Sequence, residues 1–274
     1  MVAACSVCAN TVYEPKSHET YRRALVTLNE SGVDYLVGGA FALEQLAGIP
    51  HKTHDLDIFT REKDSSELLA VLQDIGATTE MTFPHWLAKA HFEDCFVDVI
   101  YSSGNGVAVV DDEWFDNALT GTVLGVETKL CPPEETLFSK AYIMERERYD
   151  GADIAHLLRS WATRMDWDRL VRRFGPHWRV LLSHLVLFGF VYPGEMSKIP
   201  PKVIRRLARR LVQEEEATPL EPVCRGGFLS RGQYLIDFHA WGYVDARRCS
   251  PGRMSDEDIA HWTNAMQRQR GGRH

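Results

Sequence analysis

The sequence predicts an α+β fold, with a mixed β-sheet flanked by helices followed by an all-α C-terminal domain. Strand-like and helical patterns interleave up to about residue 150, and apolar residues then recur only at helical spacing. An early run reads strand, glycine turn, helix, which is typical of α/β units. The chain has 274 residues and is 45% hydrophobic, so it can fill a core larger than that of one small domain.

Spacing and glycine stops define the first elements. Residues 18–31 carry apolar side chains at helical spacing and end at Gly32, so we expect a helix there. Residues 33–37 favour a strand that stops at Gly38 and Gly39, and helical spacing resumes over residues 40–47. Residues 55–59 alternate polar and apolar side chains, as a half-buried strand does.

The remaining elements follow by the same criteria. We expect a helix over residues 65–75, strands around 86–92 and 96–101, and extended chain over 107–110 and 122–130. Pro132 and Pro133 precede a helix expected over residues 134–147. Helices are then expected over residues 152–164, 167–174, 178–190, 201–216 and 256–270.

These elements predict three parts: a flexible N-terminal segment (1–17), a core domain (18–160) and a basic helical C-terminal domain (161–274). Residues 1–160 hold 12 Lys+Arg and 26 Asp+Glu, whereas residues 161–274 hold 19 and 12. A basic part beside an acidic one indicates an anionic partner such as a nucleic acid or a nucleotide. Basic side chains that only solvate helix faces would give the same excess.

Neither a membrane span nor a secretory signal is evident in the sequence, so we expect a cytoplasmic protein without membrane contact. The 6 cysteines are too sparse for a disulfide scaffold in a chain of this length. Cys5 and Cys8 have CxxC spacing, but no second pair completes a zinc site, so we do not expect one.

Three aspartates form the candidate site. Asp55 and Asp57 project from one face of their strand, and Asp98 lies on another strand. If these strands are neighbours, the carboxylates converge, and an all-oxygen set of ligands suits Mg²⁺ or Mn²⁺. Gly38 and Gly39 lie where a strand enters a helix, a geometry that directs backbone N–H groups at a phosphate.

Residues 37–59, VGGAFALEQLAGIPHKTHDLDIF, resemble the signature of the DNA polymerase β-like nucleotidyltransferase superfamily. The pattern is similar to the branch that contains AbiEii-type toxins and lincosamide nucleotidyltransferases. Residues 140–158, KAYIMERERYDGADIAHLL, are similar to a later helix motif of that branch. The resemblance covers roughly residues 20–160, which would make residues 18–160 a nucleotidyltransferase core.

The resemblance implies roles for these residues. Gly38 and Gly39 would cradle the triphosphate of a nucleoside triphosphate (NTP), and Asp55 and Asp57 would hold two Mg²⁺ ions. Asp98 would ligate one ion and help deprotonate the acceptor hydroxyl.

Further residues are implied to bind the nucleotide: Lys52, Thr53 and Lys140. Thr53 would orient the strand or touch a phosphate, and Lys140 would approach the nucleotide. The branch usually has Arg two residues before the Thr, where this chain has His51 with Lys52 beside it.

The expected activity is Mg²⁺-dependent transfer of a nucleoside monophosphate from an NTP to an acceptor, with release of pyrophosphate. The acceptor stays open: an RNA 3′ end, a small molecule such as an antibiotic, or a protein. An antitoxin partner, as in toxin–antitoxin pairs, or a homo-oligomer is possible. Alternatives are a catalytically inactive protein that binds nucleotide or a partner protein, and a metal-dependent nuclease or phosphatase.

Overall fold

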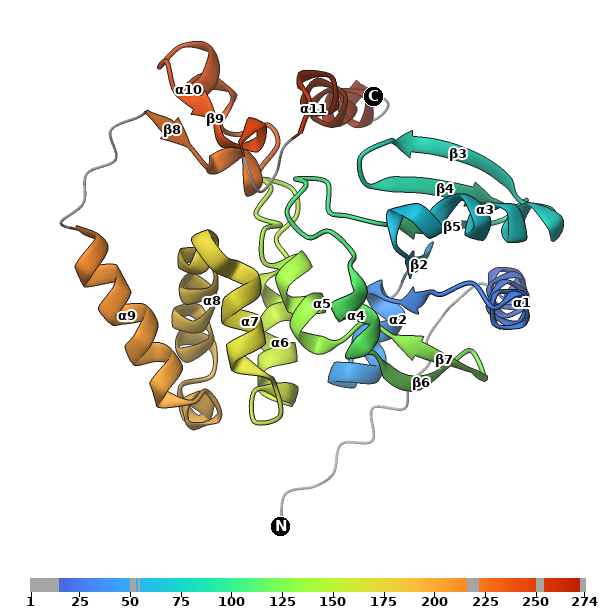
Figure 1. Ribbon diagram of the computed structural model, residues 1–274, viewed down its shortest axis with the longest axis horizontal. Helices are drawn as coiled ribbons and strands as arrows, with labels where there is room; N and C mark the ends of the chain where they lie inside the picture. Colours follow the sequence, from blue (N-terminus) through green and yellow to red (C-terminus); the bar gives the residue numbers. More distant parts are fainter. Residues whose placement is uncertain (1–14, 50–52, 54, 216–221, 250–253, 272–274) are drawn as a thin grey trace.

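The computed structural model describes residues 15–49, 53, 55–215, 222–249 and 254–271. Its centre is a seven-stranded sheet with the strand order β3-β4-β5-β2-β1-β7-β6 (Figure 1). The strands are β1 (Leu36–Val37), β2 (Asp55–Phe59), β3 (Thr78–Phe83), β4 (Leu87–His91), β5 (Phe96–Ile100), β6 (Leu119–Val123) and β7 (Val126–Leu130). The pairs β2–β5 and β1–β7 are parallel and the others antiparallel, so the sheet is mixed, as predicted.

Helices cover the sheet and extend beyond it (Figure 1). The α-helices are α1 (Pro15–Ser31), α2 (Gly39–Ala47), α3 (Ser65–Asp74), α4 (Asp112–Asp116), α5 (Pro133–Lys140), α6 (Gly151–Trp161), α7 (Trp167–Phe174), α8 (Trp178–Val191), α9 (Pro201–Glu215), α10 (Leu235–His239) and α11 (Asp256–Gly271). Short 3₁₀ helices are η1 (Glu62–Asp64), η2 (Gly175–His177), η3 (Pro193–Lys198), η4 (Gly226–Phe228) and η5 (Ala246–Arg248).

The two faces of the sheet have different cores. One face packs on α1 and α3 through buried apolar side chains of β2 and β5, among them Leu56, Ile58 and Val97. The opposite face meets α2 and helices α5 to α9, which share a second, larger core cluster. Because side chains alternate along a strand, the polar residues of β2 and β5 lie on this second face.

The helical C-terminal region continues the second core. That cluster contains Ala42 and Leu137 as well as Leu170 and Leu181, so it runs across the predicted boundary at residues 160 and 161. After α9, residues 222–249 and 254–271 form what we call the C-terminal unit. In it, β8 (Val223–Cys224) pairs in parallel with β9 (Val244–Asp245), and α11 packs against β3 (Figure 1).

The predicted fold class is confirmed, and several details differ, among them α4, α10 and the turn between β6 and β7, none of which was predicted. Residues 107–110 form no strand, because Val110 N–H bonds to the Tyr101 carbonyl at 3.1 Å as part of a loop. The helix expected over 134–147 ends at Lys140, after which the chain turns and Met144 bridges to Tyr149. Strand β3 and the β8–β9 pair were not predicted. Most of the predicted N-terminal segment (1–17), including Cys5 and Cys8, lies outside the described residues.

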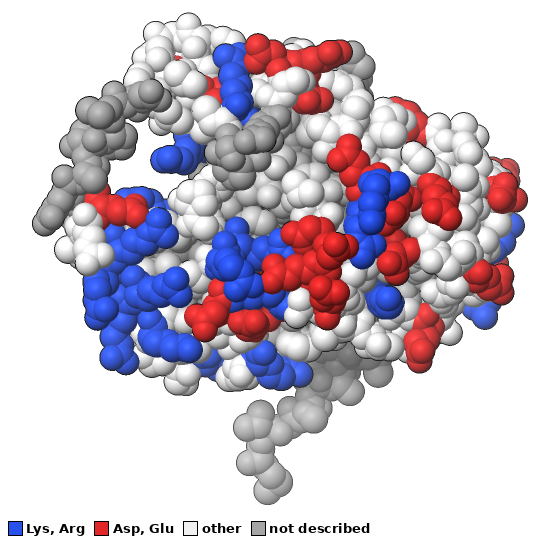
Figure 2. All heavy atoms as spheres, in the orientation of Figure 1, with Lys and Arg blue, Asp and Glu red and all other residues white. Residues whose placement is uncertain are grey.

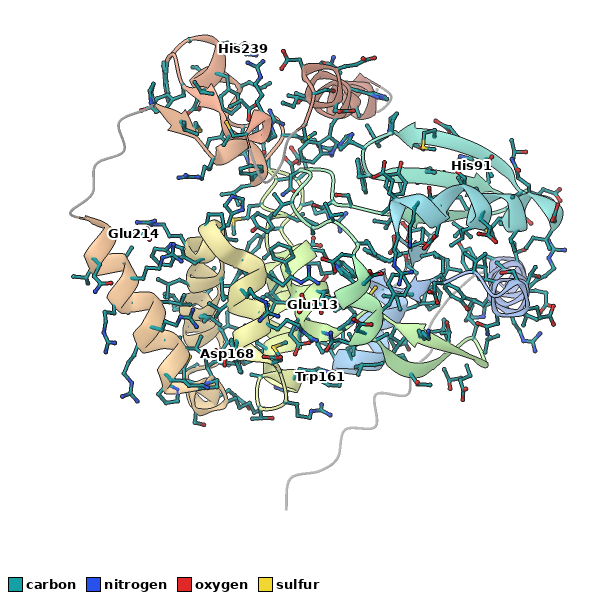
Figure 3. All side chains as sticks on the ribbon, in the orientation of Figure 1. His91, Glu113, Trp161, Asp168, Glu214 and His239 are labelled. Carbon is teal, nitrogen blue, oxygen red and sulfur yellow. The ribbon has the colours of Figure 1, made fainter. Side chains whose placement is uncertain are left out.

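Basic side chains gather over α9, as Figure 2 shows. Glu214 of α9, labelled in Figure 3, pairs with Arg210 of the same helix and with Arg179 of α8. None of the helices in the described parts of the chain has the length and apolar character needed to cross a membrane.

Candidate active site

The sheet brings the three predicted aspartates together. Strands β2 and β5 are parallel neighbours, and Asp57 lies directly opposite Asp98 in their register. Asp55 lies two residues before Asp57 on the same face. One carboxylate oxygen of each residue lies within 4.8 Å of those of the other two. This spacing and the all-oxygen chemistry fit a divalent cation such as Mg²⁺ or Mn²⁺.

Both glycines at the start of α2 are required by close contacts. A Cβ on Gly38 would lie 2.2 Å from the Phe59 ring. A Cβ on Gly39 would lie 1.6 Å from Asp57 Oδ2, and Gly39 has φ +55°, a conformation that side chains disfavour. The backbone N–H of Gly38 donates to the Asp57 carbonyl at 2.9 Å, so the turn is fixed to the aspartate strand.

The start of α2 therefore faces the carboxylate cluster. The first helical hydrogen bond runs from Ala42 N–H to the Gly38 carbonyl at 3.1 Å, and no side chain caps the helix. The N–H groups of Gly39 and Ala40 precede this bond, and the helix dipole makes this end partly positive. Such an end attracts phosphate oxygens.

The electrostatics of the cluster favour a bound cation. Burial, together with the charges of Asp55 and Asp98, raises the pKa of Asp57 to about 7. Burial also raises the pKa of Asp98, although its bond to Lys89 acts in the opposite direction. A divalent cation among the three carboxylates would offset this repulsion.

Two neighbouring side chains contact the aspartates. Thr53 Oγ1 donates a hydrogen bond to the Asp55 carboxylate, which holds that side chain in place. Lys89 lies opposite Asp98 in the β4–β5 register, and its Nζ is 2.5 Å from Asp98 Oδ1. Lys89 was not among the predicted site residues; the alternation of β4 would place it on the aspartate face once β4 is paired with β5.

Lys140 reaches the site from the end of α5. Its Nζ contacts Asp150 and Asp153 at 2.8 Å each, and Arg148 also binds Asp150, with Nε 2.8 Å from Oδ1. Burial opposes ionisation of Asp150, but the bonds from Arg148 and Lys140 lower its pKa below the ordinary value. Charged residues of the segment 140–158 thus form an ion-pair network. Lys52 and His51 lie outside the described residues.

A cavity of about 570 Å³ joins these parts. Its wall includes every described residue predicted for the site: Gly38, Gly39, Thr53, Asp55, Asp57, Asp98 and Lys140. It also includes residues that the sequence analysis did not assign to the site, among them Arg148, Phe228, Arg231 and Trp262. The volume falls within the range of small-molecule binding sites.

The sequence model of one protein family matches residues 17–175, and that family is described as "Nucleotidyl transferase of unknown function (DUF2204)". No curated protein matches the chain significantly.

Several solved structures are similar to the chain. The antibiotic-resistance factor ANT(2'')-Ia has 15% identity and a TM-score of 0.46, covering 63% of this chain and 98% of that chain. The lincosamide antibiotic adenylyltransferase LnuA has 18% identity and a TM-score of 0.39, covering 54% and 98%. An antigenic nucleotidyltransferase-like protein from Paracoccidioides brasiliensis has 16% identity and a TM-score of 0.36, covering 73% and 89%.

Proposed function

Because the chain belongs to the nucleotidyl transferase family whose sequence model matches residues 17–175, we propose that it transfers a nucleoside monophosphate from an NTP to an acceptor hydroxyl. The observation that carries this proposal is the convergence of Asp55, Asp57 and Asp98 within 4.8 Å beside the start of α2. The reaction would take place in the cytoplasm, with Mg²⁺ or Mn²⁺ as cofactor.

In this reaction the acceptor oxygen forms a bond to the α-phosphorus, and the bond from that phosphorus to the oxygen bridging the β-phosphate breaks. Pyrophosphate leaves with the electron pair of the broken bond. The acceptor proton would pass to Asp98, which lines the cavity. Asp55, Asp57 and Asp98 would hold the metal ions, which when bound stabilise charge on the phosphates and activate the acceptor oxygen.

Other residues of the chain would position the triphosphate. The N–H groups of Gly39 and Ala40 would donate to its oxygens at the positive end of α2. Lys140 and Arg148 line the same cavity and would add positive charge near the leaving pyrophosphate. Thr53 would keep the Asp55 carboxylate oriented through its hydrogen bond.

The experiment is incubation of the full chain with each α-labelled NTP, Mg²⁺ and a mixture of acceptors that includes total RNA and small molecules. We expect pyrophosphate release with one or more NTPs in the wild type and none in Asp57→Asn. Asp74→Asn, an exposed change at the end of α3, should act like the wild type. Labelled acceptor would confirm transfer.

One observation favours the alternative of a nucleotide-binding protein without catalysis, namely the ion pair between Lys89 and Asp98. Nucleotide binding without pyrophosphate release in any of these reactions would support that alternative. Cleavage of the RNA without consumption of NTP would instead support a metal-dependent nuclease, and either result would overturn the proposal.

A further inference from the structure

The C-terminal unit closes one side of the active-site cavity. Phe228, Leu229, Arg231 and Trp262 line the same cavity as the three aspartates. All four residues lie beyond residue 175, outside the part of the chain that the family model matches. The unit therefore adds a wall to the site that the matched region does not supply.

Buried contacts hold this wall in place. Asn105 Nδ2 donates to the Phe228 carbonyl at 2.8 Å, and both residues are buried. Met144 N–H donates to the Leu229 carbonyl at 3.1 Å. Ser230 Oγ donates to Glu145 Oε2 at 2.6 Å. Because three separate segments are joined, the wall is a fixed part of the site.

Two tryptophans line the cavity near the loop around Gly104. A Cβ on Gly104 would lie 2.6 Å from Trp262 Nε1, so the glycine lets this indole pack against the loop. Trp86 also lines the cavity, and its Nε1 is buried without a hydrogen-bond partner. The indole of Trp86 thus contributes an aromatic surface to the cavity, while its N–H is enclosed by protein.

Apart from the three aspartates, the positive and negative side chains of the described residues that line the cavity are equal in number. Besides the three aspartates, the charged side chains among the described lining residues are Lys140, Glu145, Arg148, Asp150, Asp153 and Arg231. All six take part in ion pairs: Lys140 with Asp150 and Asp153, Arg148 with Asp150, and Arg231 with Glu145 at 3.2 Å. Since Lys140 and Arg148 would serve the triphosphate, Arg231 is the remaining basic side chain among the described lining residues, and a highly charged acceptor would have to break its pair with Glu145.

We propose that Trp86, Trp262 and the loop around Gly104 form the acceptor subsite, and that it takes a compact, uncharged molecule with a hydroxyl group and a flat apolar ring. The inference rests on the proposed function, since it names the acceptor class of that reaction. The ring packs on the indoles, which favour flat apolar partners, and the hydroxyl group faces the three aspartates that line the same cavity. A cavity of about 570 Å³ leaves room for one small acceptor beside a nucleotide.

The test measures binding, which needs no turnover. The full chain is saturated with Mg²⁺ and α,β-methylene-ATP and titrated calorimetrically with p-nitrophenyl β-D-glucopyranoside, which is uncharged and carries one flat aromatic ring and a sugar ring with several hydroxyls. Tobramycin, a polycation, and a short oligoadenylate RNA, a polyanion, are titrated in parallel. We expect the glucoside to bind more tightly than either charged probe.

Variants locate the site. Trp262→Ala and Trp86→Ala should each weaken glucoside binding by about tenfold or more, a common cost of losing an aromatic contact. Trp262→Phe keeps a ring, so it should retain most of the affinity even if the alanine variant disturbs α11. Trp241→Ala is the matched control, because Trp241 belongs to the same unit, is 63% exposed and does not line the cavity.

Three results would overturn the inference: no glucoside binding, tighter binding of tobramycin or RNA, or glucoside binding that neither Trp86→Ala nor Trp262→Ala weakens. Affinity for α,β-methylene-ATP is measured in the same samples. Failure of this analogue to bind the wild type would count against the proposed function itself, whereas analogue binding without glucoside binding would refute only the acceptor subsite.

Discussion

Replacing Lys89 with methionine should tighten divalent-cation binding by at least about tenfold. Lys89 Nζ lies 2.5 Å from Asp98 Oδ1, and its side chain is 22% exposed. A Mg²⁺ ion held by this carboxylate at about 2.1 Å would lie on the order of 4 Å from the ammonium group. The ammonium therefore competes with the cation for Asp98 and repels it.

The size of this repulsion follows from Coulomb's law. Charges of +2 and +1 at about 4 Å repel by about 2 kcal/mol in water, and by about 8 kcal/mol at an effective dielectric constant of about 20. The lower figure alone corresponds to about thirtyfold in affinity, since each 1.4 kcal/mol or so is tenfold. Because the lysine side chain can also swing aside when the cation binds, we expect an increase of at least about tenfold.

The assay is a titration with Mn²⁺ in the absence of nucleotide, in which electron paramagnetic resonance reports the free ion. Lys89→Arg keeps the charge and should bind Mn²⁺ about as the wild type does. Lys129→Met is a control on the same sheet. Lys129 is 57% exposed, and its Nζ pairs with Asp34, at 3.8 Å, instead of with an aspartate of the site. Unchanged or weaker Mn²⁺ binding by Lys89→Met would refute the reasoning, and thermal unfolding would show whether each variant is folded.

Three further predictions follow from the site. Since the pKa of Asp57 is raised to about 7, the metal-free protein should lose stability as pH rises from about 4 to about 7. Asp57→Asn should remove on the order of 4 kcal/mol of this loss in urea unfolding, and an identical pH dependence would contradict the prediction. Gly39→Ala should abolish Mn²⁺ binding, because its Cβ would lie 1.6 Å from Asp57 Oδ2. The control Gly32→Ala, at φ +78° in open space, should lower stability by only about 1 kcal/mol and should still bind Mn²⁺. Lys140→Met should destabilise the protein by about 3 kcal/mol in urea unfolding, because it leaves the buried Asp150 with one cation fewer; an unchanged unfolding midpoint would show that this ion pair is dispensable.

Local pattern was sufficient for much of the site. Asp55 and Asp57 share a face because side chains alternate along any strand, whatever the strand packs against. The turn at Gly38 and Gly39 is likewise local, since it depends on the backbone freedom of glycine between a strand and a helix. The apolar spacing of a helix is also a local pattern, and most of the helices of the C-terminal region were predicted close to their observed bounds.

The neighbours of these residues could not be read from local pattern. Lys89 meets Asp98 only because β4 pairs with β5 in one register, and a shift of one residue would send the lysine to the other face. The helix expected up to residue 147 ends at Lys140, and in the turn that follows Glu145 bonds to Ser230, 85 residues further along. Such a contact competes with helix formation only when the distant segment is present.

By itself, then, the sequence determined the local form of the candidate site, since the type and spacing of these residues place two carboxylates on one face of a strand and a glycine turn before a helix. Only the tertiary structure decided what surrounds that site: the lysine beside Asp98, and the wall that Phe228 and Trp262 add from the far end of the chain. The physical reason is the separation along the chain over which each interaction acts. Backbone geometry and side-chain alternation act between near neighbours, whereas strand register and the docking of the C-terminal unit depend on packing between segments far apart in the chain.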